Sequence, residues 1–465
     1  MTGPQFRRAR RLIVENLEMR LALATFYVSP AGNDGQSGTS EAPWHTLQAA
    51  ADRVQSGDTV IVRSGNYVGF DLRRSGTPGN PIVFHAEPGA TITQRSLRTP
   101  DGINLEGADY VTVEGFTISG MPRAGIRAVE NQSVTLRNNT LDLNARWGIF
   151  TGFSDDLLIE VNVVSRTQIE HGIYVSNSGD RPVIRGNTLW GNRDNGIHMN
   201  GDATMGGDGI ISGALVEANV LFDNSSGGGS AINADGVQNS TFRNNLIYNT
   251  HAAGISLYRM DGGGPSTGNI VSNNTVLVAA DGRWALQVHD GSTGNIVRNN
   301  VLHNDSSFRG SLSVSADSLP GFSSDYNALT GRFTTSGGGS VLNLAQWRAA
   351  TLSDAHSFIA SPAELFVNPS GGDFHLPPGS PAIDAGTTLF APPTDLEGIV
   401  RPSGSGLDIG AFELPGVSPA GSPSALYHFD QSSGSAAADS SGNGQTATIV
   451  NQPLLGQPGV TSAGS

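Results

Sequence analysis

The sequence contains neither cysteine nor lysine, so all 27 of its basic residues are arginine. Without cysteine, no disulfide contributes to stability and thiols say nothing about the redox compartment. The formal net charge of −14 argues against a nucleic-acid partner, which selects basic surfaces, and disfavours unaided binding of a polyanion. No apolar run reaches the roughly 18 residues of a spanning helix, so no transmembrane segment is expected.

Glycine, by contrast, is abundant. It accounts for 61 of the 465 residues, while charged residues make up only 15% of the chain. This composition is too apolar for general disorder and suits a β structure with many turns.

A glycine followed by isoleucine recurs at nearly constant spacing. The pairs stand at 102–103, 125–126, 148–149, 172–173, 196–197 and 254–255, and two variants, 231–232 and 285–286, keep the phase. The successive steps are 23, 23, 24, 24, 35, 23 and 31 residues. A fixed period with a few insertions is the signature of stacked repeats.

Asparagine recurs in a second phase, where an apolar strand of each repeat ends. The positions are Asn139, Asn162, Asn187, Asn219, Asn245, Asn274 and Asn300. Asparagine tolerates the left-handed conformation of a sharp bend, and stacked amides can form a ladder. We predict that these asparagines stack at one bend of the coil.

The period of about 23 residues, without a helical pattern, resembles the right-handed parallel β-helix of bacterial pectate-lyase-like proteins. The segment 26–29, Phe-Tyr-Val-Ser, and the segment 57–62, Gly-Asp-Thr-Val-Ile-Val, resemble the entry to such a solenoid. The resemblance implies an all-β fold, a right-handed parallel β-helix, and specifies no single activity. Helical spacing of apolar residues over 47–54 predicts a short N-terminal capping helix.

Four segments follow along the chain. Residues 1–24 resemble the N-terminal segment of large exported bacterial proteins, which implies a secreted or cell-surface location. The β-helix is expected over 25–414, with 380–386 and 408–413 resembling its closing segment and forming a C-terminal cap. Residues 415–424 form a linker of proline, glycine and serine. Residues 425–465 resemble the opening of a concanavalin or laminin-G jelly roll, too short to complete it. A truncated start or a disordered tail is expected there, and the chain is expected to be a monomer.

Side chains alternate in and out along a strand, so Ile173 and Val175 should point inward and Tyr174 outward. The same phase in every repeat gives two outward columns, which we call the outward stripe. The first column is Asn104, Arg127, Phe150, Tyr174, His198, Asn233, Ser256 and Gln287; the second is Glu106, Val129, Gly152, Ser176, Asn200, Asp235, Tyr258 and His289. Residues just before the strands add Arg146, Trp147, Glu170, His171, Asp194, Asn195, His251, Arg283 and Trp284. This mixture of aromatic, polar and charged groups predicts a polysaccharide-binding cleft.

Two insertions follow strands of the same stripe. They cover residues 201–209 and 259–265. We expect them to stand as two walls on either side of the coil that carries Asn233 and Asp235, because functional loops project from rigid scaffolds in this way.

The resemblance to polysaccharide lyases implies β-elimination. A base removes the proton next to a uronate carboxylate, a cation neutralises that carboxylate, and an acid protonates the leaving oxygen. Lyases of this type often use lysine or arginine as the base and Ca²⁺ at the carboxylate; the lack of lysine excludes a lysine base here.

We therefore predict a catalytic group of His171, Tyr174, Asp194, His198 and Asp235. His198 or His171 is the expected base and Tyr174 the expected acid, because histidine is the commonest general acid or base. The expected substrate-binding residues are Arg127, Arg146, Trp147, Phe150, Asn200, Asn233, Tyr258, Arg259 and His289. Asp202 and Asp208 are candidate ligands for Ca²⁺, the one candidate cofactor.

Three other readings stay open. A glycoside hydrolase would need two carboxylates, about 5–5.5 Å apart for retention or 6.5–9.5 Å for inversion, and either Asp194 with Asp235 or Glu170 with Asp194 could supply them. An epimerase would use the same histidine and tyrosine groups as a lyase. A glycan-binding adhesin would lack a working acid and base.

Overall fold

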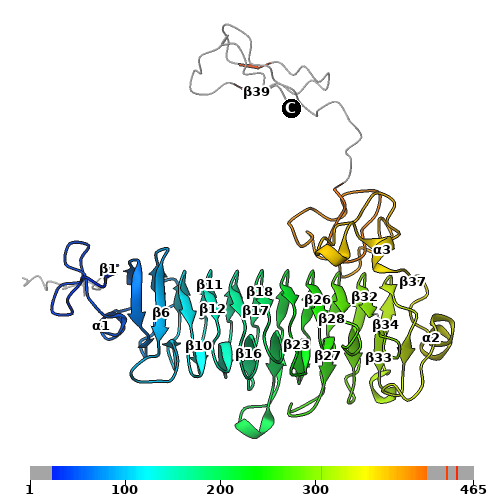
Figure 1. The fold of residues 1–465 in the computed structure, drawn as a ribbon, viewed down its shortest axis with the longest axis horizontal. Helices are drawn as coiled ribbons and strands as arrows, with labels where there is room; N and C mark the ends of the chain where they lie inside the picture. Colours follow the sequence, from blue (N-terminus) through cyan, green and yellow to red (C-terminus); the bar gives the residue numbers. More distant parts are fainter. Residues whose placement is uncertain (1–22, 305, 416–435, 438–446, 449–465) are drawn as a thin grey trace, which may run out of the picture.

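The computed structural model describes residues 23–304, 306–415, 436–437 and 447–448. The predictions for the export segment, the linker and the jelly-roll start lie almost wholly outside these residues. Between Thr25 and Ile359 the chain winds into a parallel β-helix whose coils stack along the long axis (Figure 1). This confirms the fold class expected from the repeats.

Three long sheets form the faces of the solenoid, and every strand pair within them is parallel. Sheet A contains β1 (Thr25–Val28), β2 (Thr59–Val62), β5 (Ile82–Ala86), β8 (Val111–Glu114), β11 (Thr135–Arg137), β14 (Leu158–Glu160), β17 (Val183–Arg185), β21 (Leu215–Glu217), β25 (Thr241–Arg243), β28 (Ile270–Ser272), β31 (Ile296–Arg298) and β34 (Ser323–Asp325). Sheet B contains β3 (Gly65–Val68), β6 (Ala90–Gln94), β9 (Thr117–Ser119), β12 (Thr140–Asp142), β15 (Val163–Ser165), β18 (Thr188–Trp190), β22 (Val220–Phe222), β26 (Leu246–Thr250), β29 (Thr275–Val278), β32 (Val301–Asn304), β35 (Ala328–Leu329) and β37 (Phe358–Ile359).

Sheet C carries the Gly-Ile strands. Its members are β4 (Phe70–Asp71), β7 (Ile103–Asn104), β10 (Ala124–Val129), β13 (Trp147–Gly152), β16 (Ile173–Ser176), β19 (Ile197–Asn200), β23 (Ser230–Asp235), β27 (Ala253–Tyr258), β30 (Leu286–Val288), β33 (Leu312–Val314) and β36 (Phe333–Thr334). Two short pairs complete the described strands: β20 (Ile211–Ser212) with β24 (Val237–Gln238), and β38 (Ala436–Ala437) with β39 (Ala447–Thr448).

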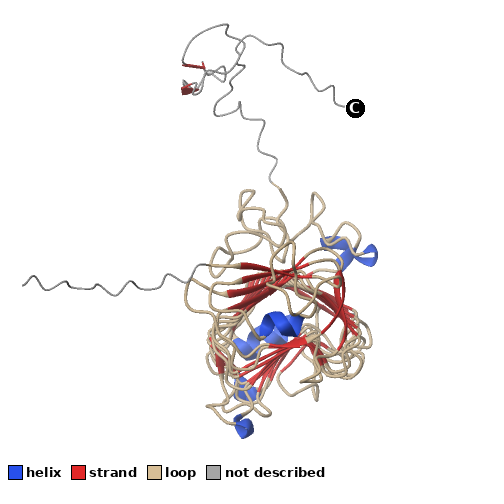
Figure 2. Cartoon of the chain, turned by 90° about the vertical axis from the view of Figure 1, so that its left-hand side faces the viewer, coloured by secondary structure: helices blue, strands red, loops and turns tan. Residues whose placement is uncertain are grey.

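The core fills the inside of the solenoid, which Figure 2 shows end-on. Ile173 and Val175 are 0% and 1% exposed, as their inward phase predicted. Helix α1 (Leu47–Ala51) begins at Thr46, whose hydroxyl accepts a hydrogen bond from the Ala49 N–H. It buries Leu47, Ala50 and Ala51 in this core, so the predicted capping helix is confirmed, with an end a few residues earlier than expected.

The predicted asparagine column is confirmed. Each side-chain amide donates to the Oδ1 of the next coil: Asn162 to Asn187 at 3.0 Å, and Asn187 to Asn219 at 2.9 Å. The series runs unbroken from Asn139 and extends to Asn327. The residue with the left-handed conformation precedes the ladder asparagine, as Asn138 and Asn244 do. The ladder asparagines therefore contribute their side-chain hydrogen bonds, and the preceding residue forms the bend.

The C-terminal part of the described chain differs from the prediction. Helix α2 (Leu344–Thr351) closes the far end, because Trp347 is fully buried and stacks on Phe333 with 5.3 Å between ring centroids. Residues 360–414, with α3 (Pro362–Leu365) and the 3₁₀ turn η3 (Pro369–Gly371), instead lie along the outer face of sheet B. The expectation that 380–386 and 408–413 form the cap is therefore wrong.

That flank is held by a second hydrophobic cluster. Ala382, Ile409 and Phe412 pack with Leu246 and Val301 of sheet B. The Gly410 N–H donates to the Asn299 carbonyl at 2.8 Å, and the Ala411 N–H donates to Thr275 Oγ1 at 2.9 Å. The segment thus covers β26, β29 and β32 and leaves sheet C open (Figure 1).

Candidate functional site

The outward stripe lies in register on sheet C. Phe150 pairs with Tyr174, Tyr174 with His198, His198 with Asn233, and Asn233 with Ser256. In the second column Ser176, Asn200, Asp235 and Tyr258 follow one another in the same way. The predicted register of both columns is therefore correct over the coils where the insertions occur. Several members are nevertheless buried, at 1% to 6% exposure: Ser176, Asn200, Asn233, Asp235 and Ser256.

His171, Tyr174 and His198 form one packed cluster. The Tyr174 ring stacks on His198 with centroids 4.8 Å apart and an interplanar angle of 8°. His171 stands edge-on to both rings, and its Nε2 lies 3.0 Å from His198 Nδ1. Two neutral imidazoles bond in this way when one nitrogen carries the proton and the other accepts it.

Burial keeps both histidines neutral. It lowers the pKa of His171 to about 4, with the nearby Arg146 charge adding to the effect. It lowers the pKa of His198 well below its usual value, and the side chain of His171 contributes. His198 lies on the outer surface of the solenoid wall, between the inward residues Ile197 and Met199, yet its Nε2 is buried and has no hydrogen-bond partner among the described residues.

The predicted binding residues of the earlier coils bond to one another. Arg127 donates to Asn104 at 2.9 Å and to Glu106 at 3.0 Å. Arg146 pairs with Glu170 at 2.5 Å and lies 5.0 Å from the Trp147 ring centroid. Trp147 in turn packs against Phe150, with centroids 4.5 Å apart. This end of the stripe is aromatic, and the charges of Arg127 and Arg146 are already matched.

Asp235 holds a loop. Its carboxylate accepts the N–H groups of Met260 and Asp261 at 2.8 Å each and of Gly262 at 3.1 Å. The side chain is 1% exposed and faces the 259–265 insertion. The structure thus gives this predicted catalytic residue a visible role in anchoring that loop.

The two insertions meet, where two separate walls were expected. Asp202 and Gly262 form an antiparallel bridge, and the Gly263 N–H donates to the Gly209 carbonyl at 2.7 Å. They join above Gly236, whose φ is +68° and where an added Cβ would lie 2.8 Å from the Gly262 Cα, so a side chain has no room there. One continuous ridge therefore borders the C-terminal ends of β19, β23 and β27.

The candidate calcium ligands sit in this ridge. Asp202 caps the 3₁₀ turn η1 (Ala203–Met205) by accepting the Thr204 N–H, and Asp208 accepts the Ile210 N–H at 2.9 Å. Arg259 donates to the Gly262 carbonyl at 3.2 Å and so also supports the ridge. Across the described ranges, no three His, Asp or Glu side chains are arranged to hold a metal ion. Asp202 and Asp208 each bond within their own loop, so the Ca²⁺ site stays a prediction and no step below runs through one.

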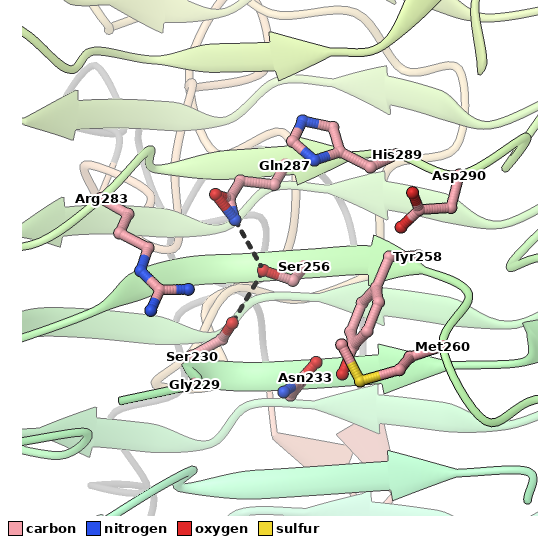
Figure 3. Close-up of a pocket in the computed structure, with 10 residues that line it drawn as sticks. All are labelled: Gly229, Ser230, Asn233, Ser256, Tyr258, Met260, Arg283, Gln287, His289 and Asp290. Atoms are coloured by element: carbon pink, nitrogen blue, oxygen red, sulfur yellow. Dashed lines mark hydrogen bonds between the residues drawn. The ribbon is translucent and has the colours of Figure 1, made fainter. Parts of the chain in front are cut away.

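A hollow of about 350 Å³ opens beside the ridge, over β23, β27 and β30. It is lined by Gly229, Ser230, Asn233, Ser256, Tyr258, Met260, Arg283, Gln287, His289 and Asp290 (Figure 3). Three predicted binding residues, Asn233, Tyr258 and His289, come together here. The hollow lies one to three coils beyond the cluster of His171, Tyr174 and His198.

The groups around the hollow are tuned by burial. Burial raises the pKa of the Tyr258 phenol, and the Asp235 charge adds to it, so the hydroxyl stays protonated. Burial lowers the pKa of His289, which leaves the imidazole neutral, and its Nε2 lies 2.8 Å from Ser313 Oγ. Arg283 makes no ion pair with any described residue.

Unpaired polar atoms border the same place. Asn233 donates to Asn195 Oδ1 at 3.0 Å, but its own Oδ1 is buried without a partner. The Oδ1 of Asn200, on the neighbouring strand, is also unpaired, while its amide donates to the Tyr174 hydroxyl at 3.2 Å. Such atoms cost about 1–3 kcal/mol each unless a ligand or water meets them, which makes this surface a candidate for binding.

The comparisons with known proteins agree with the β-helix fold. Residues 26–205 match the model of a family described as a Pel9A-like, right-handed β-helix region. Pectate lyase PEL9 of Emericella nidulans is 27% identical over 208 residues, which cover 42% of this chain and 48% of that protein. The uncharacterised protein YwoF of Bacillus subtilis is 33% identical over 103 residues, 20% of this chain and 22% of that one.

The chain therefore spans at most about half the length of these curated relatives. The crystal structure of pectate lyase Pel9A superposes with a TM-score of 0.58 at 17% identity, over 84% of this chain and 96% of that one. At that identity the likeness shows a shared parallel β-helix fold. No helix in the described part of the chain is long and apolar enough to cross a membrane.

Two features of the hollow were not predicted. Sequence reasoning placed Arg283 at the edge of the stripe and assigned it no role, although it holds the same phase before its strand as Arg146. Gly229 and Met260 were not considered as lining residues. The register signal was sufficient to find Arg283, whereas Met260 depends on how the 259–265 loop folds.

Proposed function

We propose that this Pel9A-like protein is a polysaccharide lyase that cleaves a uronate-containing glycan by β-elimination in the hollow. The observation that carries the proposal is the meeting of an unpaired cation, a neutral imidazole and a protonated phenol around one opening. The likeness to pectate lyase PEL9 supports the same class of reaction. Such a substrate also fits a secreted or cell-surface location.

Each group has one task. The Arg283 guanidinium pairs with the uronate carboxylate and stabilises the charge that develops when the neighbouring carbon loses its proton. His289 accepts that proton, because its lowered pKa leaves it neutral. The electron pair forms a carbon–carbon double bond as the bond to the glycosidic oxygen breaks. Tyr258 donates its proton to that oxygen, and proton exchange through solvent restores both side chains.

The test is an assay with uronate polysaccharides that follows the ultraviolet absorbance of the unsaturated product. The wild-type protein should produce it, and His289→Ala should lower kcat by about 10²–10⁴-fold. His85→Ala is the matched control, because His85 lies on sheet A and bonds Glu114 at 2.7 Å. New reducing ends without unsaturation, or full activity in His289→Ala, would refute the proposal.

A hydrolase is the second candidate, and a specific carboxylate pair favours it. Burial raises the pKa of Asp194, and the Glu170 charge adds to this, while Glu170 itself is ion-paired with Arg146. Environments that separate the protonation of two carboxyl groups are typical of glycosidases. Asp194→Asn should then abolish the release of reducing ends from a neutral glycan, whereas a lyase centred on Tyr258 and His289 should keep forming unsaturated product.

A further inference from the structure

One edge of the stripe carries charges in a fixed order. In the sheet C strands from β10 to β33, one isoleucine or leucine of each strand pairs with its counterpart in the next coil. The residues three positions before these isoleucines and leucines therefore also follow one another in a column. We call it the edge column. From β10 to β33 its members are Arg123, Arg146, Glu170, Asp194, Gly229, Ala252, Arg283 and Arg309.

The first cations of the edge column are neutralised within the protein. Arg123 pairs with Asp101 at 2.5 Å, and Arg146 pairs with Glu170 at 2.5 Å. Asp194 follows, with no hydrogen bond or ion pair from its carboxylate within the described residues. The early coils therefore present no free positive charge in this column and one carboxyl group that makes no hydrogen bond within the described residues and feels the charge of its neighbour Arg193.

The last two members behave differently. Arg283 lines the hollow, and Arg309 lies one coil further, packed 5.3 Å from the Phe308 ring centroid. Neither makes an ion pair with any residue that the structure describes. Adjacent coils are about 4.8 Å apart, so Arg283 and Arg309 occupy neighbouring rungs, roughly 14 Å and roughly 19 Å from the rung of Asp194.

A glycan lying along the stripe thus meets two chemically different surfaces. At the later coils, free arginines favour a carboxylate. At the earlier coils, Trp147, Phe150 and Tyr174 offer apolar contact, and a uronate beside Asp194 would meet a like charge. The overall charge of −14 adds repulsion for a densely charged polymer.

We infer that the glycan this site selects carries sparse uronates separated by neutral sugars, with a uronate at Arg283 and Arg309 and neutral sugars over β13, β16 and β19. A polymer with a carboxylate on every sugar fits this surface less well. The inference rests on the proposed function only in that the stripe binds a glycan.

The experiment measures binding separately from turnover. The full-length His289→Ala protein, which should degrade the polymers about 10²–10⁴-fold more slowly, is titrated at low ionic strength with three polymers of matched length. These are a fully uronate polymer, an alternating uronate–neutral copolymer and a neutral polymer. We expect the copolymer to bind at least about 10-fold more tightly than either other polymer, a difference of about 1.4 kcal/mol. Equal or tighter binding of the fully uronate polymer overturns the inference.

Two variants sharpen this result. Arg283→Gln should remove the advantage of the copolymer over the neutral polymer, whereas Arg137→Gln, a control whose arginine pairs with Glu114 at 2.5 Å on sheet A, should keep it. Glu170→Gln should free Arg146 and raise affinity for the fully uronate polymer. An unchanged preference in both Arg283→Gln and Glu170→Gln contradicts the inference.

The two proposals fail separately. Unsaturated product from wild type, together with preferred binding of the fully uronate polymer, would refute the inference about sparse uronates and support the lyase proposal. Preferred binding of the copolymer, with no unsaturated product from any polymer, would support the inference about sparse uronates and refute the lyase proposal.

Discussion

Two columns of polar side chains run along the same solenoid, one inside the wall and one outside it. In the asparagine column, every amide from Asn139 to Asn300 donates to the next coil. In the outward stripe, His198 Nε2, Asn200 Oδ1 and Asn233 Oδ1 have no partner among the described residues. Both columns obey one register, yet only the first is saturated.

The difference separates stability from function. A buried polar group stabilises a fold when its bonds are complete, and it costs free energy when they are not. The complete column therefore holds the coils together, and the incomplete stripe leaves polar atoms available to a ligand. Substitutions in the two columns should consequently affect different measurements.

The largest expected effect is on activity, in the stripe. Tyr258→Phe keeps the ring and removes the phenolic proton donor, so kcat should fall by about 10²–10⁴-fold while the unfolding free energy changes little. Kinetics on the preferred uronate glycan and a denaturant titration measure the two. Tyr248→Phe, the same substitution on sheet B where Tyr248 stacks on Phe222, is the control. A loss of stability equal to the loss of activity would contradict the separation.

The second-largest expected effect is a loss of folding stability at acidic pH, caused by His171 in the stripe. The pKa of His171 is about 4 in the folded protein against 6.5 for the free side chain, so the unfolded chain binds the proton first as the pH falls. Stability contributed by this site is intact above pH 6.5 and is lost progressively toward pH 4, by about 3 kcal/mol in total. Chemical denaturation across this range should show the slope, and His171→Gln should flatten it.

In the asparagine column, Asn187→Ala should lower the unfolding free energy by about 1–3 kcal/mol. Its amide bonds the Ile159 carbonyl and Asn219 Oδ1 at 2.9 Å each, and its own oxygen accepts from Asn162, so neighbours on both sides lose partners. Thermal unfolding measures the loss, while activity per folded molecule should stay close to wild type. Wild-type stability in this variant would show that the ladder contributes nothing.

The smallest effect belongs to neither column. The pKa of His375 is raised by hydrogen bonding to Asp373, then to Glu397, on the flanking segment. Because the folded value is the higher one, this stabilisation is present below the unfolded pKa of 6.5 and is lost as pH rises through the folded value. The side chain is 51% exposed, so His375→Asn should cost at most about 1 kcal/mol, and only at low pH. A destabilisation that grows with pH would show that the assigned pairing is wrong.

Sequence periodicity predicted what repeats. Gly-Ile spacing and inward phase were enough for the sheet C register of Tyr174, His198 and Asn233, and the asparagine spacing was enough for the ladder. Both features repeat once in every coil, so their spacing can be recognised within a single sequence. The interior position of Ile173 follows from the same rule.

What does not repeat could not be read in this way. The bridge between Asp202 and Gly262 joins loops of two different coils, and neither inserted sequence contains a pattern that predicts this contact. Asp235 looked like a free carboxylate because its backbone partners belong to that folded loop. The segment 360–414 was expected at the end of the solenoid, but α2 closes that end, and apolar residues such as Phe374 find Tyr248 on the flank instead.

The asparagine ladder also restricts how a molecule of this kind can change in length. Removing one whole coil, for example 173–196, would take out one rung and bring Asn162 next to Asn219, so the chain of amides would close again. A deletion of half a coil would instead bring a different residue type to the rung and leave two amides facing a gap. The solenoid wall should therefore tolerate insertion or deletion of whole coils only, while loops outside the wall, such as 201–209, can change in length.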